Sequence, residues 1–577
     1  MQQPIYMLSD IHKRKVDHRF QKNGGLYLSD NWLELILDMR FYNFNLFLLV
    51  FITSVCSVHA QEPEFLRGNI YDSKTGEPII FATVRIKGKS VGVITNEDGG
   101  FRIPKEFWLE RDTLLISSMG YQKKELPLLS LSLSLINPIR LFAHVFELSE
   151  AIIKSNKKKT PGAAQIVKYA INNIPENYPQ EDFALVGYYR DYQNNNSEYV
   201  NLNEAIIEIR DEGFDVKNNF NSKFLMYENL KNRDFKIDSF AAKPYDYDSQ
   251  DKIIPSAIMY NKGGNEFLTL IIHDAIRNYE ENTYSFINNM ANDFLKTHKF
   301  RIVKNTIFNE SPIYEISIRF RKNGYLAKGK IFIDKNNFSI HRLDYSLYIQ
   351  KMMNTSRYST ANDNDQKEKE TDAGLVYQIV TEYRPAKNQK MFLNYISFRN
   401  KFIVNRPPIF RTIKFVIDLD NKCFKASLNR MPANLDKIKK KNFIISYKER
   451  QLPIEKIDFK KDSLQFLVYP DSNTISFQKE ITELFTENDS LRISNLKYEL
   501  LNIKDSLGNG LNESITENLE QYREYFVQEV IVKIDNEPNI TSYMKRNLPL
   551  ISPLQPIYSV EPKHNYWMNT PLKSSKN

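Results

Sequence analysis

The sequence predicts a mainly β, α+β protein, in which an N-terminal β-sandwich of the seven-stranded type precedes a larger region of curved antiparallel sheet with helices. Three observations support this fold class. The 577 residues leave room for several domains. The 37 Phe and 33 Tyr, against only 19 Gly, favour strands. Apolar and polar residues alternate in many short runs that turn residues separate.

The chain before Gln61 has the three-part pattern of a secretory signal peptide. Residues 39–40 are Met-Arg and supply a positive start, residues 44–55 form an apolar run, and within residues 57–60 Val58 and Ala60 are small enough for the pocket of a signal peptidase. The apolar run is shorter than the roughly 20 residues of a membrane span. We therefore predict a signal peptide at residues 39–60.

Residues 1–38 carry charges of both signs and contain no targeting pattern, so we expect an extension that an overlong gene prediction adds before the true start, Met39. Two alternatives stay open. One is a cytoplasmic tail ahead of an uncleaved anchor, and the other is lipidation of Cys56, although Val55 before it is larger than usual. After cleavage Cys423 is the sole cysteine, which excludes an intrachain disulfide. We predict an exported protein, periplasmic or outer-membrane-associated.

The charge balance argues against nucleic acid as a partner. Lys and Arg outnumber Asp and Glu by 79 to 70, and the net charge of +9 is small for this length. Lysine bursts at residues 157–159 and 439–441 are separate and do not alternate with aromatic residues that could stack on bases. We predict solvated loops at both places.

Residues 61–147 are predicted to form the sandwich. In "LRGNIYDSKTGEPI" a strand leads to a turn at residues 73–76, and Pro78 suits the entrance of the next strand. "FATVRIKG" alternates Ala82, Val84 and Ile86 with polar residues, and "DTLLISSMGYQKKEL" repeats the pattern around a glycine turn. Four or more short strands in this length indicate an all-antiparallel sandwich.

Within this region, residues 66–126 resemble the carboxypeptidase regulatory-like domain, a transthyretin-like β-sandwich that often begins exported outer-membrane proteins. The resemblance rests on the order and spacing of four features, which are the strand with Gly68 and Ile70, "TGEPIIFATVRIKG", "GVITNEDGGFRI" and "LLISSMGYQKKEL". It implies a fold and not a peptidase activity.

The stretch "NEDGGF" at residues 96–101 is predicted to be a turn and not a calcium loop. A calcium loop needs more oxygen ligands at regular positions, whereas this stretch continues directly into "FRIP". Gly99 permits a turn that directs Phe101 and Ile103 into the sandwich. We expect the side chains of Asn96, Glu97 and Asp98 to remain in water.

No pattern in the chain predicts catalysis. His144 and Glu147 have the His-x-x-Glu spacing of a zinc carboxypeptidase, and His273 lies at a plausible distance for a third ligand. His144, however, belongs to an alternating run that is typical of the last sandwich strand, and no substrate-binding motif accompanies it. Cys423 is expected to be an inert thiol in a strand or loop. We predict no catalytic, cofactor-binding or metal residue and no cofactor.

A basic linker with Pro and Gly is expected at residues 148–162, followed by an α+β region with antiparallel sheet at residues 163–425. Helical spacing predicts a packing helix at residues 163–174 and a second helical stretch at residues 267–295. The expected core positions of the second stretch are Leu270, Ile271, Ile276, Tyr284, Ile287 and Phe294.

The clearest strand pattern follows. Residues 314–320 alternate before an Asn323-Gly324 turn, and two further strands flank a turn at residues 335–337. His341 in the second of these strands is expected to be a surface histidine despite the nearby Asp344. Polar residues 353–374 are predicted to be a mobile loop. The outline is similar to the lipoprotein-carrier half-barrels of the envelope, a likeness of fold that supplies no function.

Residues 426–577 are predicted to be a C-terminal α+β extension. "KIDFKKDSLQFLVYP" and "REYFVQEVIVKID" are typical of strands, whereas residues 481–507 have mixed helical spacing through Leu484, Leu491, Leu496, Leu500 and Ile503. Near the end, Tyr566 and Trp567 are expected to pack onto a core.

These patterns together predict a noncatalytic exported cell-envelope protein that binds or scaffolds another envelope component, a protein or a glycan, and that can associate peripherally with the outer membrane. The sandwich would be a rigid spacer and the curved sheet the contact surface. The alternatives are an envelope hydrolase, including the zinc carboxypeptidase, and an outer-membrane β-barrel protein.

Overall fold

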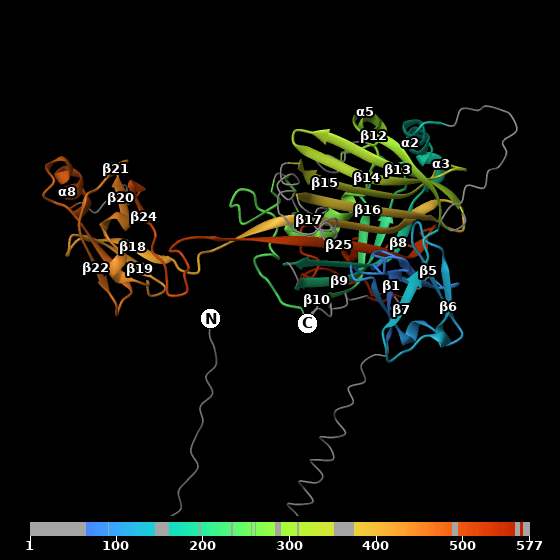
Figure 1. The fold of residues 1–577 in the computed structure, drawn as a ribbon, viewed down its shortest axis with the longest axis horizontal. Helices are drawn as coiled ribbons and strands as arrows, with labels where there is room; N and C mark the ends of the chain where they lie inside the picture. Colours follow the sequence, from blue (N-terminus) through green and yellow to red (C-terminus); the bar gives the residue numbers. More distant parts are fainter. Residues whose placement is uncertain are drawn as a thin grey trace, which may run out of the picture. The chain divides into compact units, whose positions relative to one another are not determined.

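We analysed a computed structural model of the chain (Figure 1). The structure describes residues 65–89, 92–144, 161–195, 198–231, 235–255, 257–259, 261–282, 290–308, 311–350, 374–486, 494–559 and 566–568. Several predictions lie outside these ranges. They are the extension at residues 1–38, the signal peptide at residues 39–60, most of the linker at residues 148–162, the loop at residues 353–373, and the side chains of Cys56, Glu147, Tyr284, Ile287 and Leu491.

The first described region is a two-sheet sandwich of strands β1 to β7. One sheet has the order β4-β1-β7 and the other the order β3-β2-β5-β6. The strands are β1 Phe65–Asp72, β2 Thr83–Ile86, β3 Gly92–Ile94, β4 Gly100–Pro104, β5 Thr113–Ser117, β6 Lys124–Pro127 and β7 Asn137–Leu141. Their alternating apolar side chains form one core, which includes Leu66, Ile70, Val84, Phe101 and Ile116. The predicted sandwich is confirmed, except that β1 and β7 run parallel.

The "NEDGGF" stretch is the tight turn between β3 and β4. Gly99 has φ +71°, and the Asn96 Oδ1 atom accepts hydrogen bonds from the backbone N–H groups of Asp98 (3.1 Å) and Gly100 (2.7 Å). Phe101 is buried in the sandwich core, as predicted. The prediction that residues 96–98 remain in water was wrong, because Asn96 is 1% exposed and holds the turn from inside.

Replacing Gly99 by alanine should destabilise the sandwich by at least about 2 kcal/mol, since a left-handed alanine is strained and its Cβ atom would lie 2.4 Å from the Ile70 carbonyl oxygen. Gly76→Ala is the matched control, because Gly76 has φ +76° with open space around it. Urea unfolding followed by tryptophan emission measures the effect, since Trp108 and Trp567 both lie in this core. Equal losses in both variants would contradict the predicted clash.

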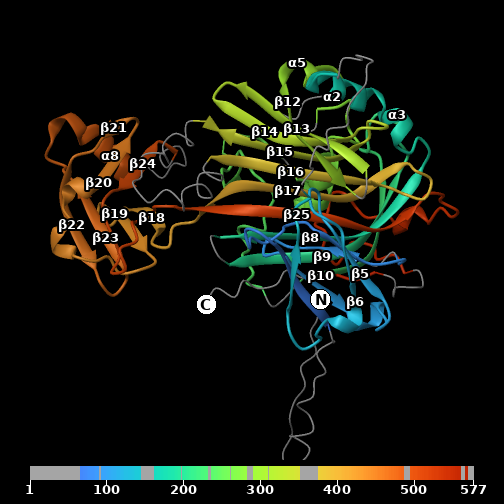
Figure 2. The same ribbon diagram turned by 45° about the vertical axis from the view of Figure 1, so that its right-hand side comes forward.

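The second region is a large antiparallel sheet with the order β10-β9-β8-β25-β17-β16-β15-β14-β13-β12, and short β11 pairs with β17 (Figure 2). The strands are β8 Phe183–Asn194, β9 Tyr199–Asp211, β10 Lys223–Lys231, β11 Lys252–Ile253, β12 Lys299–Phe308, β13 Ser311–Lys322, β14 Tyr325–Asp334, β15 Ile340–Ile349, β16 Leu375–Pro385, β17 Met391–Arg406 and β25 Ile515–Ile531. The predicted hairpins form as expected, with Asn323 and Gly324 both at positive φ in the turn between β13 and β14.

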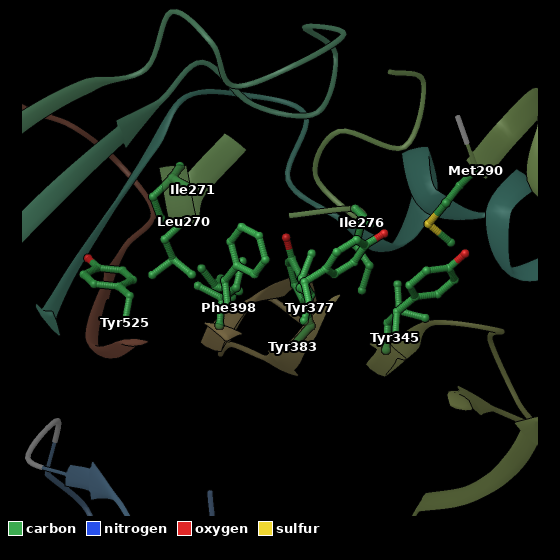
Figure 3. Close-up of a cluster of buried hydrophobic side chains, with 14 of the residues drawn as sticks. Leu270, Ile271, Ile276, Met290, Tyr345, Tyr377, Tyr383, Phe398 and Tyr525 are labelled. Atoms are coloured by element: carbon green, nitrogen blue, oxygen red, sulfur yellow. The ribbon is translucent and has the colours of Figure 1, made fainter. Parts of the chain in front are cut away.

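Helices cover one face of this sheet. They are α2 Ala163–Asn172, α3 Ile174–Asn177, α4 Glu266–Ile272 and α5 Leu295–Thr297, with a π-helical turn at Met290–Phe294. Leu270 and Ile271 of α4 lie over Tyr525 and Phe398 of the central strands (Figure 3). The packing helix at residues 163–174 is confirmed in α2 and α3. The stretch at residues 267–295 is helical only in part, because α4 ends at Ile272.

A lobe of residues 407–512 is inserted between β17 and β25. Its described residues contain the sheet β18-β19-β23-β22, the sheet β21-β20-β24 and the helix α8. The elements are β18 Thr412–Asp418, β19 Cys423–Leu428, β20 Phe443–Tyr447, β21 Arg450–Gln451, β22 Ile454–Lys460, β23 Gln465–Pro470, α8 Gln478–Thr486 and β24 Leu496–Leu500. The helical pattern predicted for residues 481–507 was wrong for residues 496–500, because these pair with β20 as a strand.

The chain therefore divides differently from the predicted boundary between residues 425 and 426. That boundary falls inside β19, whereas the insertion begins and ends at a pair of neighbouring residues in the large sheet, Arg406 and Ile515. The physical reason is that β25 pairs with both β17 and β8 and so returns the chain to the large sheet. No helix within the described ranges combines the length and the apolar character that a membrane crossing requires.

Candidate functional site

The sandwich packs against the face of the large sheet that is opposite to the helices, called the outer face here. Ile94 of β3 shares a small apolar core with Val380, Tyr395 and Phe526 of strands β16, β17 and β25. The ring of Phe81 lies 5.0 Å from that of Tyr395. The central strands are thus covered on both faces, by α4 on one and by the sandwich on the other.

Arg85 joins the two regions by hydrogen bonds. Its Nη2 atom donates to the Asn394 Oδ1 atom (3.1 Å) and to the Val527 carbonyl oxygen (2.8 Å), and its guanidinium lies 4.9 Å from the centre of the Phe526 ring. Arg85 is buried, and burial, with the nearby charge of Arg384, lowers its pKa. A charged group is buried only at a cost unless it is hydrogen-bonded, so these bonds favour one arrangement of sandwich and sheet.

A second polar contact lies in a cavity of about 50 Å³ between sandwich and sheet. Its polar lining includes Glu97 of the "NEDGGF" turn with Arg399, Tyr522 and Glu524 of the sheet. Burial raises the pKa of the Glu97 carboxyl to about 7, although the charge of Arg399 and a hydrogen bond with Tyr522 oppose the shift. The acidic turn therefore faces the large sheet instead of bulk water.

Glu97 should make stability depend on pH. Its folded-state pKa of about 7 exceeds its ordinary value of 4.5, so the stability that its proton provides is complete below pH 4.5 and is lost as the pH rises through about 7. Glu97→Gln should gain stability relative to the wild type between pH 5 and pH 8, roughly the window of that shift. Urea titrations at several pH values test this, with exposed Glu77→Gln as the control. Parallel pH profiles of Glu97→Gln and the wild type would contradict the assignment.

The helix-covered face holds a buried ionic network. The Nε atom of Arg523 donates to the Oε2 atom of Glu266 in α4 (2.6 Å), and the Lys252 Nζ atom lies 3.8 Å from the other carboxylate oxygen. Lys252 also donates to the carbonyl oxygens of Ala241 (2.7 Å) and Lys243 (2.9 Å). Burial lowers the pKa of Lys252 to about 8, although Glu266 opposes the shift. The network fixes α4 on the central strands.

A second buried network links β9 to the turn after α4. Arg277 donates to both carboxylate oxygens of Asp211 at 2.9 to 3.0 Å. Nearby, the Tyr383 hydroxyl donates to the Asp274 Oδ2 atom (2.7 Å), and burial raises the pKa of Asp274 to about 6. These groups border a cavity of about 20 Å³. Such a cavity can hold a water molecule but not a substrate.

The histidines and the cysteine that the sequence offers for chemistry do not form one cluster among the described residues. His273 is buried against Phe398, and burial lowers its pKa to about 4. His144 follows the last sandwich strand, as predicted. Among the described residues, no three His, Cys, Asp or Glu side chains are placed to share a metal ion. Cys423 is buried in β19, where burial raises its thiol pKa.

The prediction for His341 was wrong. It is not a surface histidine but is 5% exposed, with its Nε2 atom 3.8 Å from the Asp334 Oδ2 atom and its ring 5.7 Å from that of Phe308. Asp344, its proposed neighbour, instead accepts a hydrogen bond from Arg342 (2.8 Å). An irregularity in the pairing of β14 and β15 next to Ile340 changes which side chains are buried there, and simple alternation does not predict it.

Sequence reasoning also missed the buried cations. In β25 a period of two places Arg523 on the same face as Leu519, Tyr525 and Val527, which all belong to the core under the helices. The sequence therefore shows a charged residue at a position that belongs to the apolar face of the strand, and this indicates a buried ion pair. The partner of Arg523 in α4 could not be predicted from the sequence.

Two hollows have the size of ligand sites. One, of about 310 Å³, lies in the lobe between α8 and the end of β23. Its lining includes Tyr469, Phe485, Asn421, Thr482, one basic residue, Lys422, and one acidic residue, Glu455. The other, of about 500 Å³, lies at the corner of the large sheet formed by β12 and β13. Ligand pockets typically measure about 300 to 1,000 Å³.

Solved structures give only remote likenesses. A domain assigned to outer-membrane lipoprotein sorting from Vibrio parahaemolyticus is 10% identical with a TM-score of 0.21, covering 41% of this chain and 86% of that chain. A LolA superfamily protein from Nitrosomonas europaea is 10% identical with a TM-score of 0.18, covering 42% of this chain and 86% of that chain. These values support no functional argument.

A short segment of the chain has a curated relative. Over 86 residues, 15% of this chain, the chain is 33% identical to the TonB-dependent receptor SusC of Bacteroides thetaiotaomicron, and the match spans 8% of that receptor's length. Residues 66–142 match the sequence model of the family described as CarboxypepD_reg-like domain. The N-terminal sandwich of this chain is therefore a carboxypeptidase regulatory-like domain, as its sequence features predicted.

Proposed function

We propose that this protein is a noncatalytic component of the cell envelope that binds or scaffolds another envelope component. The sandwich is a spacer, and the large sheet and its lobe are the contact surfaces. Export is supported by the signal pattern at residues 39–60. A place in the envelope is supported by the resemblance of a short segment of the chain to a TonB-dependent receptor.

The main support for this proposal is the pair of hydrogen bonds by which Arg85 connects the sandwich to the large sheet. Its two hydrogen bonds reach a side chain of β17 and a carbonyl of β25, the same two strands between which the lobe is inserted. Strands β17 and β25 therefore belong to the large sheet, accept the hydrogen bonds from the sandwich and carry the two connections to the lobe. Such a construction suits a protein that holds binding surfaces at a fixed separation.

The hollow in the lobe supports binding over hydrolysis. A glycosidase needs a pair of carboxylates about 5 to 10 Å apart, whereas the described residues that line this hollow include one, Glu455. The lining includes the partly buried aromatic residue Tyr469 and the polar residues Asn421 and Thr482, which are residue types that stack on and hydrogen-bond to sugars. The Lys456 Nζ atom lies 5.6 Å from the centre of the Tyr469 ring and the Thr482 hydroxyl donates to the Gln478 carbonyl oxygen (2.6 Å), so a sugar would use the other face of the ring. The bound component of this surface is accordingly a glycan.

Fractionation of the native cell tests the proposal, with mass spectrometry of the mature N-terminus and of crosslinked partners. We expect a chain that begins at Gln61, recovered in the periplasm or outer membrane and crosslinked to an envelope component. Tyr469→Ala should abolish crosslinks at the lobe, whereas Tyr498→Ala, another lobe tyrosine outside the hollow, should not. An intact Met1 in the cytoplasm would overturn the proposal.

A further inference from the structure

The outer face at the β12 end of the large sheet carries a row of cations. Lys299 of β12 lies directly opposite Arg319 of β13, which in turn lies opposite Lys328 of β14. Ile318, the neighbour of Arg319 in β13, belongs to the core under the helices, so the three cations point away from that core. Like charges directly opposite each other destabilise a sheet. Lys328 has a partner within the protein, because its Nζ atom lies 5.4 Å from the centre of the Tyr348 ring. For Lys299 and Arg319 the described residues supply no such contact, and folding alone gives no reason for placing these two charges opposite each other.

The nearby acids are already paired. Glu315 contacts the Nζ atoms of Lys330 (2.8 Å) and Lys304 (3.6 Å), and Asp344 is paired with Arg342 (2.8 Å). Among the described residues, no ion pair to Lys299, Arg319 or Arg321 is formed. Within the described ranges, these three exposed side chains thus present positive charge that no carboxylate neutralises.

The same three cations line the open hollow of about 500 Å³, together with Thr297 and the half-buried ring of Phe320. Their positions come from the start of β12 and the end of β13, so they surround one concave corner instead of following a long stripe. Arg319 and Arg321 carry guanidinium groups, whose fork of N–H donors matches phosphate oxygens. A concave site of this size and charge suits one compact headgroup with phosphate.

We propose that this corner binds the phosphate headgroup of an anionic membrane lipid and so places the sheet against a membrane surface. Val303 in β12, 49% exposed, adds an apolar side chain to the same strand, which a lipid surface accommodates better than a soluble anion does. This inference rests on the proposed envelope function, because it names the chemistry of one envelope component that the sheet contacts.

Sedimentation with vesicles tests the inference, using protein purified from the native cell. Vesicles of phosphatidylcholine with phosphatidylglycerol should bind the protein, and vesicles of phosphatidylcholine alone should not. The double variant Arg319→Glu and Arg321→Glu should lower binding at least about tenfold, since each cation near an anionic surface contributes roughly a fivefold factor. Binding should also fall as the salt concentration rises.

The matched control is the double variant Lys440→Glu and Lys441→Glu, which changes the net charge equally at an exposed site on the lobe. It should bind as the wild type does, and an equal loss in both double variants would overturn the inference in favour of a general charge effect. Binding of soluble pyrophosphate by a protein that binds no vesicles would overturn the lipid assignment. Failure of vesicle binding by protein recovered from the envelope would overturn this inference alone, whereas a cytoplasmic chain with intact Met1 would overturn the proposed function.

A stability measurement gives an independent readout. Arg319→Gln should raise the urea midpoint of unfolding, because it removes the repulsion with Lys299 and Lys328, while it weakens vesicle binding. A residue that has only a structural role would not improve stability when it is replaced. An unchanged or lowered midpoint would contradict the argument that the row is kept for a ligand.

Discussion

Glu266→Gln should lower the free energy of unfolding of the large sheet by about 3 to 5 kcal/mol. The substitution removes the carboxylate that accepts from Arg523 (2.6 Å) and lies 3.8 Å from Lys252, and so leaves two buried cations without their nearest anion. A buried charge that loses its partner pays the full cost of desolvation. Glutamine fills the same volume, so the loss reports charge and not a cavity.

Urea unfolding followed by far-ultraviolet circular dichroism measures this loss. The deficit should shrink as the pH rises toward 8, because without Glu266 the pKa of Lys252 falls further below its present value of about 8 and the lysine becomes neutral at lower pH. Glu125→Gln is the control, since Glu125 forms an exposed ion pair with Lys87 and should change nothing measurable. If Glu266→Gln had the same free energy of unfolding as Glu125→Gln, the buried ionic network would not stabilise the large sheet.

Arg277→Lys should cost about 3 kcal/mol, even though the positive charge is kept. Arg277 donates to both oxygens of Asp211 and to the carbonyl oxygens of Gly213 (2.7 Å), Val216 (2.9 Å) and Asn218 (3.3 Å). A lysine ammonium is a point donor and cannot reach these acceptors together. Buried carbonyl oxygens would then lose their partners, each at a cost of roughly 1 to 3 kcal/mol.

The same urea measurement applies to Arg277→Lys. Arg411→Lys is a matched control, because Arg411 is exposed at the start of the lobe and makes no side-chain ion pair among the described residues. We expect its unfolding midpoint to equal that of the wild type. If Arg277→Lys and Arg411→Lys were equally stable, the forked geometry of the Arg277 guanidinium would not contribute to the stability of the fold.

Local patterns predicted the elements of this fold whose information is local. The β13–β14 hairpin follows from strict alternation and the Asn323-Gly324 turn, and the helix of residues 163–174 follows from its apolar spacing. Trp567 was expected to pack onto a core, and it lies 4.9 Å from the ring of Phe107 in the sandwich. In each case the signal lies within a few residues of the structure it predicts.

Long-range pairing was not predictable in the same way. Leu496 and Leu500 have helical spacing, yet they belong to β24, because pairing with β20 supplies hydrogen bonds and burial that outweigh local preference. The partners of buried charges are similarly distant in sequence. Nothing local indicates that Arg523 would meet Glu266, or that Arg85 would meet Asn394.

The sequence by itself determined the carboxypeptidase regulatory-like sandwich and the strand-rich character of the rest, since turns and alternation depend on consecutive residues. Only the tertiary structure decided that β25 returns to the large sheet, that Glu97 faces that sheet and that Lys299 and Arg319 share a row. The reason is physical. The register between two strands depends on which side chains can be buried together, and these residues are distant in sequence. A cation becomes part of a binding site only when a neighbouring strand places a second cation beside it.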